Sequence, residues 1–405
     1  MPRLASWESC TGCGACFSKC PQKCIRFKED KLGNIYPLID ETACVNCRQC
    51  EKVCPQITTD IHLRTPEKAF AAWNNDSTIR KESASGGVAS AFYRYALKKG
   101  ISCYGVAFDS EWNINYIKIQ NDEALGKVRN SKYAFSNTQN IFCEIKKELN
   151  EGKSVLWIGL PCQTAGLKKY LGEDTAKLVT VDLICHGVCS VEYLKQYISS
   201  IEKKRQHHYT QCFFRDANFD TSKYAYTLYT HTSVKPDYIE FVKDGLYSMG
   251  YHKGITYREN CYHCKYASVK RTGDLTLADY WLIGEKIPFS YEKDNVSLVF
   301  ANDARGEGYL RNVIEEGFMT AVERPISEAI EVQGQLQHPT SKSFEQKIFK
   351  KSYQKSGDFV SAISKATGFR RFCDKNHLNR FFNLVYKVSV KVNSIFINRN
   401  RNEKV

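Results

Sequence analysis

Cysteine is the residue type with the clearest chemistry in this sequence. The chain of 405 residues contains 18 cysteines, and nine of them precede residue 55. One run reads Cys10-x2-Cys13-x2-Cys16-x3-Cys20-Pro21, and the same spacing recurs at Cys44, Cys47, Cys50, Cys54 and Pro55. Two such runs are typical of a bacterial-type ferredoxin module with two 4Fe-4S clusters.

In ferredoxins of this type the fourth cysteine of each run binds the other cluster. That rule predicts a first ligand set of Cys10, Cys13, Cys16 and Cys54, and a second set of Cys44, Cys47, Cys50 and Cys20. A structural zinc site is the alternative, but zinc ribbons use isolated cysteine pairs and need only four ligands. We interpret Cys24, the fifth thiol of the opening run, as a small buried residue beside a cluster.

Four later cysteines have positions that suit a further metal centre. Cys162 in "WIGLPCQ" and Cys185 in "DLICHG" each follow a predicted strand, and Cys261 and Cys264 are spaced as a single chelating pair. Ligands of open α/β sheets gather beyond the carboxyl ends of the strands, so we expect Cys162 and Cys185 at one edge. A third 4Fe-4S cluster, zinc on the same four thiols, and ordinary buried cysteines beside an unrelated pair all remain open.

Small residues at 85–87 suggest a phosphate site. Ser85, Gly86 and Gly87 open a predicted helix, where free backbone N–H groups can bind a phosphate or pyrophosphate. An ordinary capped helix start explains them equally well. The sequence has no GxGxxG after a strand and no P-loop, so neither a dinucleotide-binding Rossmann fold nor a P-loop nucleotide site is supported.

Short apolar runs alternate with helical stretches after the ferredoxin module. We expect strands at 101–108, 154–160 and 177–184, helices at 87–100, 141–152 and 191–205, and a strand followed by a helix within 296–317. Such alternation predicts an α/β domain with a mostly parallel sheet.

Composition and charge limit the cellular setting. The chain has no run of about 18 apolar residues and no apolar N-terminal stretch, so we expect it in the cytoplasm, where cysteines serve metal or redox chemistry rather than disulfides. Residues 341–405 hold 15 Lys or Arg against 4 Asp or Glu, which accounts for most of the net charge of +14. This tail suits either a solvated extension or an interfacial helix peripheral to the inner face of the membrane, and does not indicate specific nucleic-acid recognition.

The sequence resembles the beta subunit of coenzyme F420-reducing hydrogenases and dehydrogenases. The stretches that carry the resemblance are "SASGGV", "RNSKYAFS", "GLPCQ", "DLICHGVCS", "NCYHCKYA" and "RTGDLTLADYW", in family order over about residues 5–335. The resemblance implies an iron-sulfur flavoprotein with FAD in the α/β domain and a further 4Fe-4S cluster near it. It assigns that cluster to Cys162, Cys185, Cys261 and Cys264, and makes flavin contacts of Ser85, Gly86, Gly87, Ser131, Lys132 and Tyr133. Lys132 would offset phosphate charge or act near the flavin ring.

The sequence departs from the family pattern in two places. Cys189 stands where the family usually has proline, which offers an alternative thiolate near Cys185. In "LADYWL", Asp279 and Trp281 match the family while the flanking glycines do not. His186 is either a proton donor or a structural histidine.

These observations divide the chain into a ferredoxin domain (1–60), a flavin and iron-sulfur domain (61–335) and a basic C-terminal extension (336–405). The expected function is an oxidoreductase that passes electrons between a hydride carrier such as coenzyme F420, FAD, the 4Fe-4S clusters and a redox partner protein. The alternatives are a ferredoxin-driven reductase of an organic substrate linked to polysaccharide synthesis, and a flavin-free electron-transfer subunit. The sequence identifies no catalytic residue and no direction of electron flow.

Overall fold

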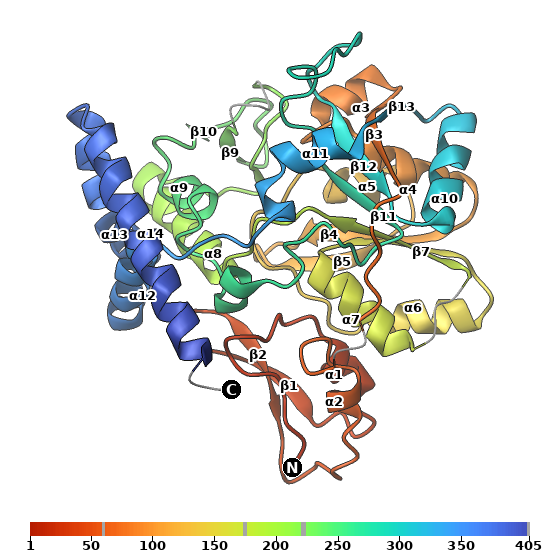
Figure 1. Ribbon diagram of the computed structural model, residues 1–405, viewed down its shortest axis with the longest axis horizontal. Coiled ribbons are helices and arrows are strands. Elements are labelled where there is room, and N and C mark those ends of the chain that lie inside the picture. The colour runs from red at the N-terminus through yellow and green to blue at the C-terminus, as the bar shows by residue number, and fades with distance from the viewer. Residues whose placement is uncertain (59–60, 173–175, 220–223, 403–405) are drawn as a thin grey trace.

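The computed structural model describes residues 1–58, 61–172, 176–219 and 224–402, with side chains up to Lys391. Figure 1 shows a small N-terminal module below a larger body built on one sheet, with three C-terminal helices along one side. The expected domain boundary at residue 60 lies outside the described residues.

The N-terminal module consists of one β-hairpin and two short helices. β1 (Ile25–Glu29) pairs with β2 (Ile35–Ile39) in antiparallel fashion, and the cysteine runs lead into α1 (Ala15–Lys19) and α2 (Gln49–Lys52). Gly14 has a φ of 81° before α1, and a β-carbon there would lie 2.4 Å from Thr138 Oγ1 in the body. The first cysteine run therefore needs glycine both for its turn and for its close approach to the body.

One eight-stranded sheet forms the centre of the body. Its strand order is β13-β3-β12-β11-β7-β6-β4-β5. The strands are β3 (Lys68–Asn74), β4 (Ser102–Phe108), β5 (Ile114–Ile119), β6 (Val155–Gly159), β7 (Leu178–Leu183), β11 (Leu275–Asp279), β12 (Ser297–Ala301) and β13 (Met319–Arg324).

The sheet is mixed, which corrects the expectation of a mostly parallel one. Only the four central strands β11, β7, β6 and β4 run parallel, and every pair outside them is antiparallel. An antiparallel neighbour can follow through a short turn, as at residues 109–113 between β4 and β5, whereas a parallel neighbour needs a crossover. The carboxyl ends of the central strands still share one edge, as the sequence predicted.

Helices cover both faces of the sheet. α4 (Val88–Lys98) and α10 (Ala304–Glu315) pack on one face, while α6 (Ile141–Asn150) and α7 (Pro161–Leu171) pack on the other. Along β6, Leu156 and Ile158 face the first core and Trp157 the second. β6 is therefore buried on both faces, which explains its uninterrupted apolar sequence.

The remaining elements flank the site end of the sheet. They are α3 (Ser77–Glu82), α5 (Asp122–Val128), α8 (Val191–Arg205), α9 (Leu246–His252), the 3-10 helix η2 (Glu259–His263), α11 (Ile326–Val332), the 3-10 helix η3 (Gly334–Leu336), and a small sheet of β8 (Gln211–Phe213), β9 (Tyr226–Tyr229) and β10 (Tyr238–Glu240). The predicted helices and strands of the body are confirmed, with ends shifted by a few residues.

The C-terminal extension is helical. α12 (Phe344–Ser356) and α13 (Phe359–Lys375) pack against α8, where the rings of Phe349, Tyr353 and Phe359 surround Tyr193. α14 (Asn379–Asn402) makes the end of the extension helical, one of the two alternatives that the sequence left open, while residues 403–405 lie outside the described part. Among the described residues, no helix combines the length and apolar character that crossing a membrane requires.

Candidate functional site

The "RTGDLTLADYW" stretch fixes the central strands that lead to the site. Arg271 and Asp182, both almost fully buried, form an ion pair at 3.1 Å. The second Asp182 oxygen accepts hydrogen bonds from the backbone N–H groups of Thr272 (2.8 Å) and Gly273 (3.1 Å). These bonds tie β11 to β7, so that the strand ends carrying Asp279 and Cys185 stay side by side.

The four later cysteines come together at this edge. Cys185 follows β7, Cys162 is the second residue of α7 just after β6, Cys261 lies in η2, and Cys264 ends that turn. Burial raises the pKa of the Cys162 thiol, and the thiols of Cys264, Cys185 and Cys261 raise it further. Four thiols from three separate segments therefore lie within electrostatic range of one another, and none of them forms a disulfide.

The cysteines of the first ferredoxin set also lie near one another, with Cys10, Cys13 and Cys16 buried and Cys54 partly buried. Burial raises the pKa of Cys10, Cys13 and Cys16, and at each of them the thiol of Cys54 adds to the rise. Cys54 comes from the second cysteine run, and its place within electrostatic range of these three thiols is the one that the predicted exchange of the fourth cysteine requires.

The second ferredoxin set surrounds a small cavity near the surface. Its lining includes Cys20, Cys44, Cys47 and Cys50, together with Cys24. The sulfur of Cys24 lies 3.4 Å from that of Cys20. Cys24 is buried against this set, whereas Cys47 is exposed.

The thiol sets are spread out rather than focused on a point. Within the described ranges, no three His, Cys, Asp or Glu side chains converge closely enough to bind a single metal ion. A 4Fe-4S cluster binds its thiolates at separate irons, so its ligands surround a volume instead of one ion.

Helix α7 joins the third thiol set to the first. Cys162 lies in the first turn of the helix, and Gly166, one turn later, contacts the ferredoxin module: a β-carbon at Gly166 would lie 2.8 Å from the Cys13 sulfur. Burial raises the pKa of the Tyr266 phenol, with contributions from Cys162 and Cys264 of the third set and Cys13 of the first. Tyr266 therefore lies within electrostatic range of both sets.

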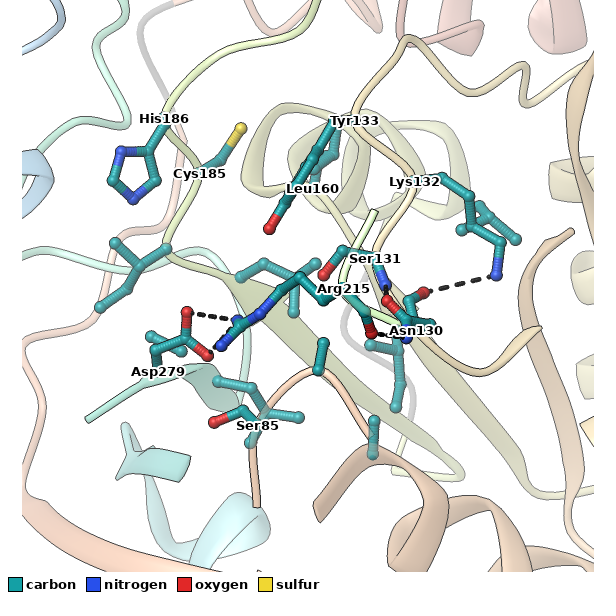
Figure 2. Close-up of a pocket in the computed structure, with 18 of the residues that line it drawn as sticks. Ser85, Asn130, Ser131, Lys132, Tyr133, Leu160, Cys185, His186, Arg215 and Asp279 are labelled. Carbon is teal, nitrogen blue, oxygen red and sulfur yellow. Dashed lines mark hydrogen bonds and ion pairs between the residues drawn. The ribbon is translucent and has the colours of Figure 1, made fainter. Parts of the chain in front are cut away.

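A pocket of about 360 Å³ opens on the other side of the third set. Its lining includes Cys185 and five of the six predicted flavin contacts, namely Ser85, Gly87, Ser131, Lys132 and Tyr133. Figure 2 shows Ser85 at one side of this pocket and Tyr133, Cys185 and His186 at the other. Cys185 of the third thiol set therefore forms part of the pocket wall.

The two glycines of "SGG" have different roles. Gly87, with a φ of 76°, precedes α4, and the N-terminal residues of that helix line the pocket. Gly86 is not among the lining residues: a β-carbon there would lie 2.4 Å from the carbonyl oxygen of Ala72 and 2.7 Å from the nitrogen of Ser297. Gly86 is therefore required by the packing of this turn against β3 and β12.

Lys132 is turned to one side of the pocket. Its ammonium group donates to the carbonyl oxygens of Arg129 (2.8 Å), Lys127 (3.0 Å) and Asn130 (3.4 Å), and Figure 2 shows it beside Asn130. Burial lowers the pKa of Lys132 to about 7. The Lys132 ammonium group therefore caps the C-terminal end of α5.

Hydrogen bonds hold the loop that carries Ser131 and Tyr133. Asn130 donates to the carbonyl oxygen of Arg215 at 2.7 Å, and Gln163 of "GLPCQ" donates to that of Ser136 at 2.8 Å. Gln163 is fully buried one residue after Cys162. A hydrogen bond therefore joins "RNSKYAFS" to "GLPCQ", two of the stretches that carry the resemblance to the family.

An aromatic region and a partly buried ion pair also line the pocket. Tyr133 stacks on Tyr251 with ring centroids 4.5 Å apart. Arg215 pairs with Asp279 at 2.8 Å and lies over the Tyr224 ring at 4.6 Å. Arg215 could not be predicted from the sequence, because nothing in the stretch around it signals a site.

Two residues left open by the sequence have clear surroundings. The Cys189 sulfur lies 3.2 Å from the carbonyl oxygen of Tyr133 and 3.1 Å from the Tyr247 hydroxyl, and burial raises its pKa to about 12. We interpret it as part of the aromatic core. His186 lies at the exposed rim of the pocket, with Nδ1 3.2 Å from Gln335 Nε2.

Comparison with protein families agrees with this arrangement. Residues 69–142 match the N-terminal model and residues 152–326 the C-terminal model of the coenzyme F420 hydrogenase/dehydrogenase beta subunit, together more than half of the chain. The chain belongs to this family. Residues 9–57 match a 4Fe-4S dicluster domain, which confirms the ferredoxin module. The protein is thus an iron-sulfur member of a family of coenzyme F420-linked oxidoreductase subunits.

Individual relatives match parts of the chain. The coenzyme F420-dependent sulfite reductase of Methanocaldococcus jannaschii is 32% identical over 163 residues, which are 40% of this chain and 25% of the reductase. An uncharacterized ferredoxin of the same organism is 34% identical over 61 residues, 15% of this chain and 78% of the ferredoxin. A ferredoxin-like protein from the nif region of Rhizobium leguminosarum bv. trifolii is 36% identical over 58 residues, 13% of this chain and 83% of that protein.

A solved structure is similar over most of the chain. It is a chain of the xenon-derivatized F420-reducing [NiFe] hydrogenase complex from Methanosarcina barkeri, with 18% identity and a TM-score of 0.47. The similarity covers 76% of this chain and 92% of that one.

Proposed function

We propose that this protein is an iron-sulfur flavoprotein that passes electrons between a soluble hydride carrier, such as coenzyme F420, and a redox partner protein. The observation that supports this most strongly is the series of adjoining sites. Cys185 lines the pocket, its thiol set includes Cys162, and the helix that carries Cys162 contacts Cys13 through Gly166.

The pocket has the chemistry that FAD requires. The start of α4 at Gly87 offers backbone N–H groups for a pyrophosphate, and the loop at Ser131 adds small polar groups. Tyr133 and its stacked neighbour Tyr251 form a flat apolar surface beside Cys185 for the ring system. Bound FAD would supply an exchange between a two-electron hydride carrier and one-electron clusters.

The thiols would hold three 4Fe-4S clusters, one on each set, and they follow one another from the pocket outwards. The third set adjoins the pocket through Cys185, the first adjoins α7 through Cys13, and the second reaches the surface at Cys47. The role of Arg215 and Asp279 is to hold the aromatic end of the pocket, where they bring Tyr224 over the guanidinium.

Reduction of the protein by a hydride carrier tests this proposal. Protein purified without oxygen is mixed with reduced coenzyme F420, and separately with NADH, while flavin absorbance and the electron paramagnetic resonance (EPR) signals of the clusters are followed. We expect both flavin and cluster signals to change in the wild type. In Cys185→Ala the flavin should still react, while reduction of the ferredoxin clusters should slow at least tenfold.

Cys143→Ala is the matched control, because Cys143 is exposed on α6 and belongs to none of the three sets. It should behave as the wild type. Protein that contains no flavin would favour a flavin-free electron-transfer subunit instead. Reduction by a ferredoxin but by neither hydride carrier would favour the ferredoxin-driven reductase of an organic substrate.

The extension carries a feature that favours a second role, contact with an anionic membrane surface. Phe381, Leu384 and Val388 form an exposed apolar stripe on α14, and Arg380 and Lys387 are exposed beside it. Cations next to an apolar stripe fit the boundary of an anionic bilayer. We expect the protein to sediment with vesicles containing anionic lipid. Leu384→Asp should release it, whereas the same change at exposed Val234, far from α14 in the sequence, should not.

A further inference from the structure

Arg258 is a deeply buried cation at the junction of the ferredoxin module and the body. Its side chain is 1% exposed and lies between the rings of Tyr36, 4.5 Å away, and Phe135, 4.8 Å away. Its guanidinium donates to the carbonyl oxygens of Ile35 at 3.1 and 3.2 Å and of Cys10 at 3.4 Å. Arg258 comes from the body, whereas three of these four neighbours belong to the ferredoxin module.

No carboxylate balances this charge. Three arginines are buried in the part of the chain that the structure describes, and Arg215 and Arg271 pair with Asp279 and Asp182. For Arg258, no such ion pair within 4.0 Å exists among the described residues; its guanidinium donates to the backbone carbonyl oxygens of Ile35 and Cys10. An arginine stays protonated in proteins, and a buried charge without an opposite charge is strongly destabilising.

The adjacent carboxylate is already engaged. Glu259 pairs with Lys342 and, at 3.6 Å, with Lys350, both from the C-terminal extension. Its charge is therefore balanced by two lysines, and the cation next to it in the sequence needs another anionic neighbour.

Candidate cluster ligands of two different sets lie next to Arg258. Its guanidinium donates to the carbonyl oxygen of Cys10 in the first set at 3.4 Å. Cys261 of the third set follows three residues later, and its backbone N–H donates to the carbonyl oxygen of Arg258 at 3.0 Å. A β-carbon at Gly12, between Cys10 and Cys13, would lie 3.3 Å from Arg258 Nη2, so the guanidinium reaches into the first cysteine loop itself.

We propose that Arg258 is the shared counter-ion of the clusters on the first and third thiol sets, and that it raises the reduction potential of both. This inference rests on the proposed function, because it requires a cluster on each set. Adding an electron adds one negative charge to a centre that is already anionic, and a fixed cation in a site of low dielectric favours that addition. Arg258 is a positioning and tuning residue and does not touch the substrate.

Potentiometric titration of the whole protein, followed by EPR without oxygen, tests the inference. In Arg258→Met the ratio of reduced to oxidised first and third clusters at a fixed potential should fall at least tenfold, which corresponds to a shift of about 59 mV for a one-electron couple. The second cluster is the internal control, because none of its four ligands is among the described contacts of Arg258. Arg258→Lys, which keeps the charge, should leave both reduction potentials close to those of the wild type.

Arg26→Met is the matched control, since Arg26 is exposed on β1. It should leave all three potentials unchanged. If Arg258→Met does not retain its clusters, Arg258→Gln is titrated instead, because its amide can still donate to the Cys10 and Ile35 carbonyl oxygens. Arg258→Gln should show the same fall in the ratio of reduced to oxidised first and third clusters.

Two failures are distinguishable. A wild-type protein with about 8 iron atoms per chain would refute the third cluster, and with it the proposed relay. About 12 iron atoms with unshifted first and third potentials in the charge-removing variant would refute the role of Arg258 alone. Equal shifts of all three clusters would also contradict it, because they would indicate a general loosening of the ferredoxin module.

Discussion

Replacing Asp182 by asparagine should strongly destabilise the body of this protein. One carboxylate oxygen of Asp182 accepts from Arg271 at 3.1 Å and from Thr276 Oγ1 at 2.6 Å. The other accepts from the N–H groups of Thr272 and Gly273. In Asp182→Asn, the amide NH2 must therefore face either the Arg271 guanidinium or two backbone donors. Both orientations leave buried donors unpaired.

The size of the effect follows from this geometry. Breaking a buried ion pair by removing one charge costs about 3–5 kcal/mol. For domains of this size about 1 kcal/mol corresponds to a shift of roughly 2–4 °C in Tm, so we expect the Tm to fall on the order of 10 °C. The strands that present Cys185 and Asp279 are those that Asp182 joins, and iron in the third set should be lost before the ferredoxin clusters.

Thermal unfolding without oxygen, at one scan rate and followed by circular dichroism, measures this effect. Glu316→Gln provides the matched carboxylate-to-amide control, because Glu316 pairs with Lys98 and Lys99 on the surface. Exposed pairs of this kind contribute at most about 1 kcal/mol. A Tm change in Asp182→Asn no larger than that in Glu316→Gln would refute the reasoning.

Three further predictions follow from single residues. Gly87→Ala should lower the amount of flavin retained after desalting, because a β-carbon at a φ of 76° strains the start of α4. Gly308→Ala is the control, since a β-carbon there would have no neighbour within 4 Å, and it should retain flavin as the wild type does. Equal retention in both variants would contradict a flavin site at α4. Burial lowers the pKa of His252 to about 4, below the ordinary value of 6.5. Because the unfolded chain then binds the proton more readily than the folded protein, the free energy of unfolding should fall by about 3 kcal/mol as the pH falls from 6.5 to 4. In urea titrations, His252→Gln should lack this part of the pH dependence, and an unchanged profile would show that His252 is not the cause. Cys24→Ala should leave the iron content unchanged, and loss of about four iron atoms would make Cys24 a ligand.

The grouping of the cysteines could be predicted because its signals lie in the sequence itself. Strand-end positions predicted that Cys162 and Cys185 lie at one edge of the sheet, whereas the exchange of Cys20 and Cys54 between two clusters stays a prediction from the spacing of the two ferredoxin runs. The direction of the outer strands could not be predicted, because β3, β12 and β13 have the same apolar character whether they run parallel or antiparallel.

The polar residues of the site were harder to predict. Arg215 and Arg258 are separated by more than forty residues from the groups that they contact across the fold, and neither lies in a pattern with periodic spacing. Gly86 and Lys132, in contrast, were predicted from the sequence as flavin contacts. Both lie in matching stretches, yet their contacts in this structure are to the backbone of neighbouring elements.

The content of iron, acid-labile sulfide and flavin in protein purified without oxygen tests the central claim most directly. Twelve cysteines in three sets and one pocket predict about 12 iron atoms, about 12 sulfides and about one FAD per chain. Cys185→Ala should contain about four iron atoms fewer, with its ferredoxin clusters intact. About 8 iron atoms and no flavin in the wild type would contradict the account and leave only the ferredoxin module.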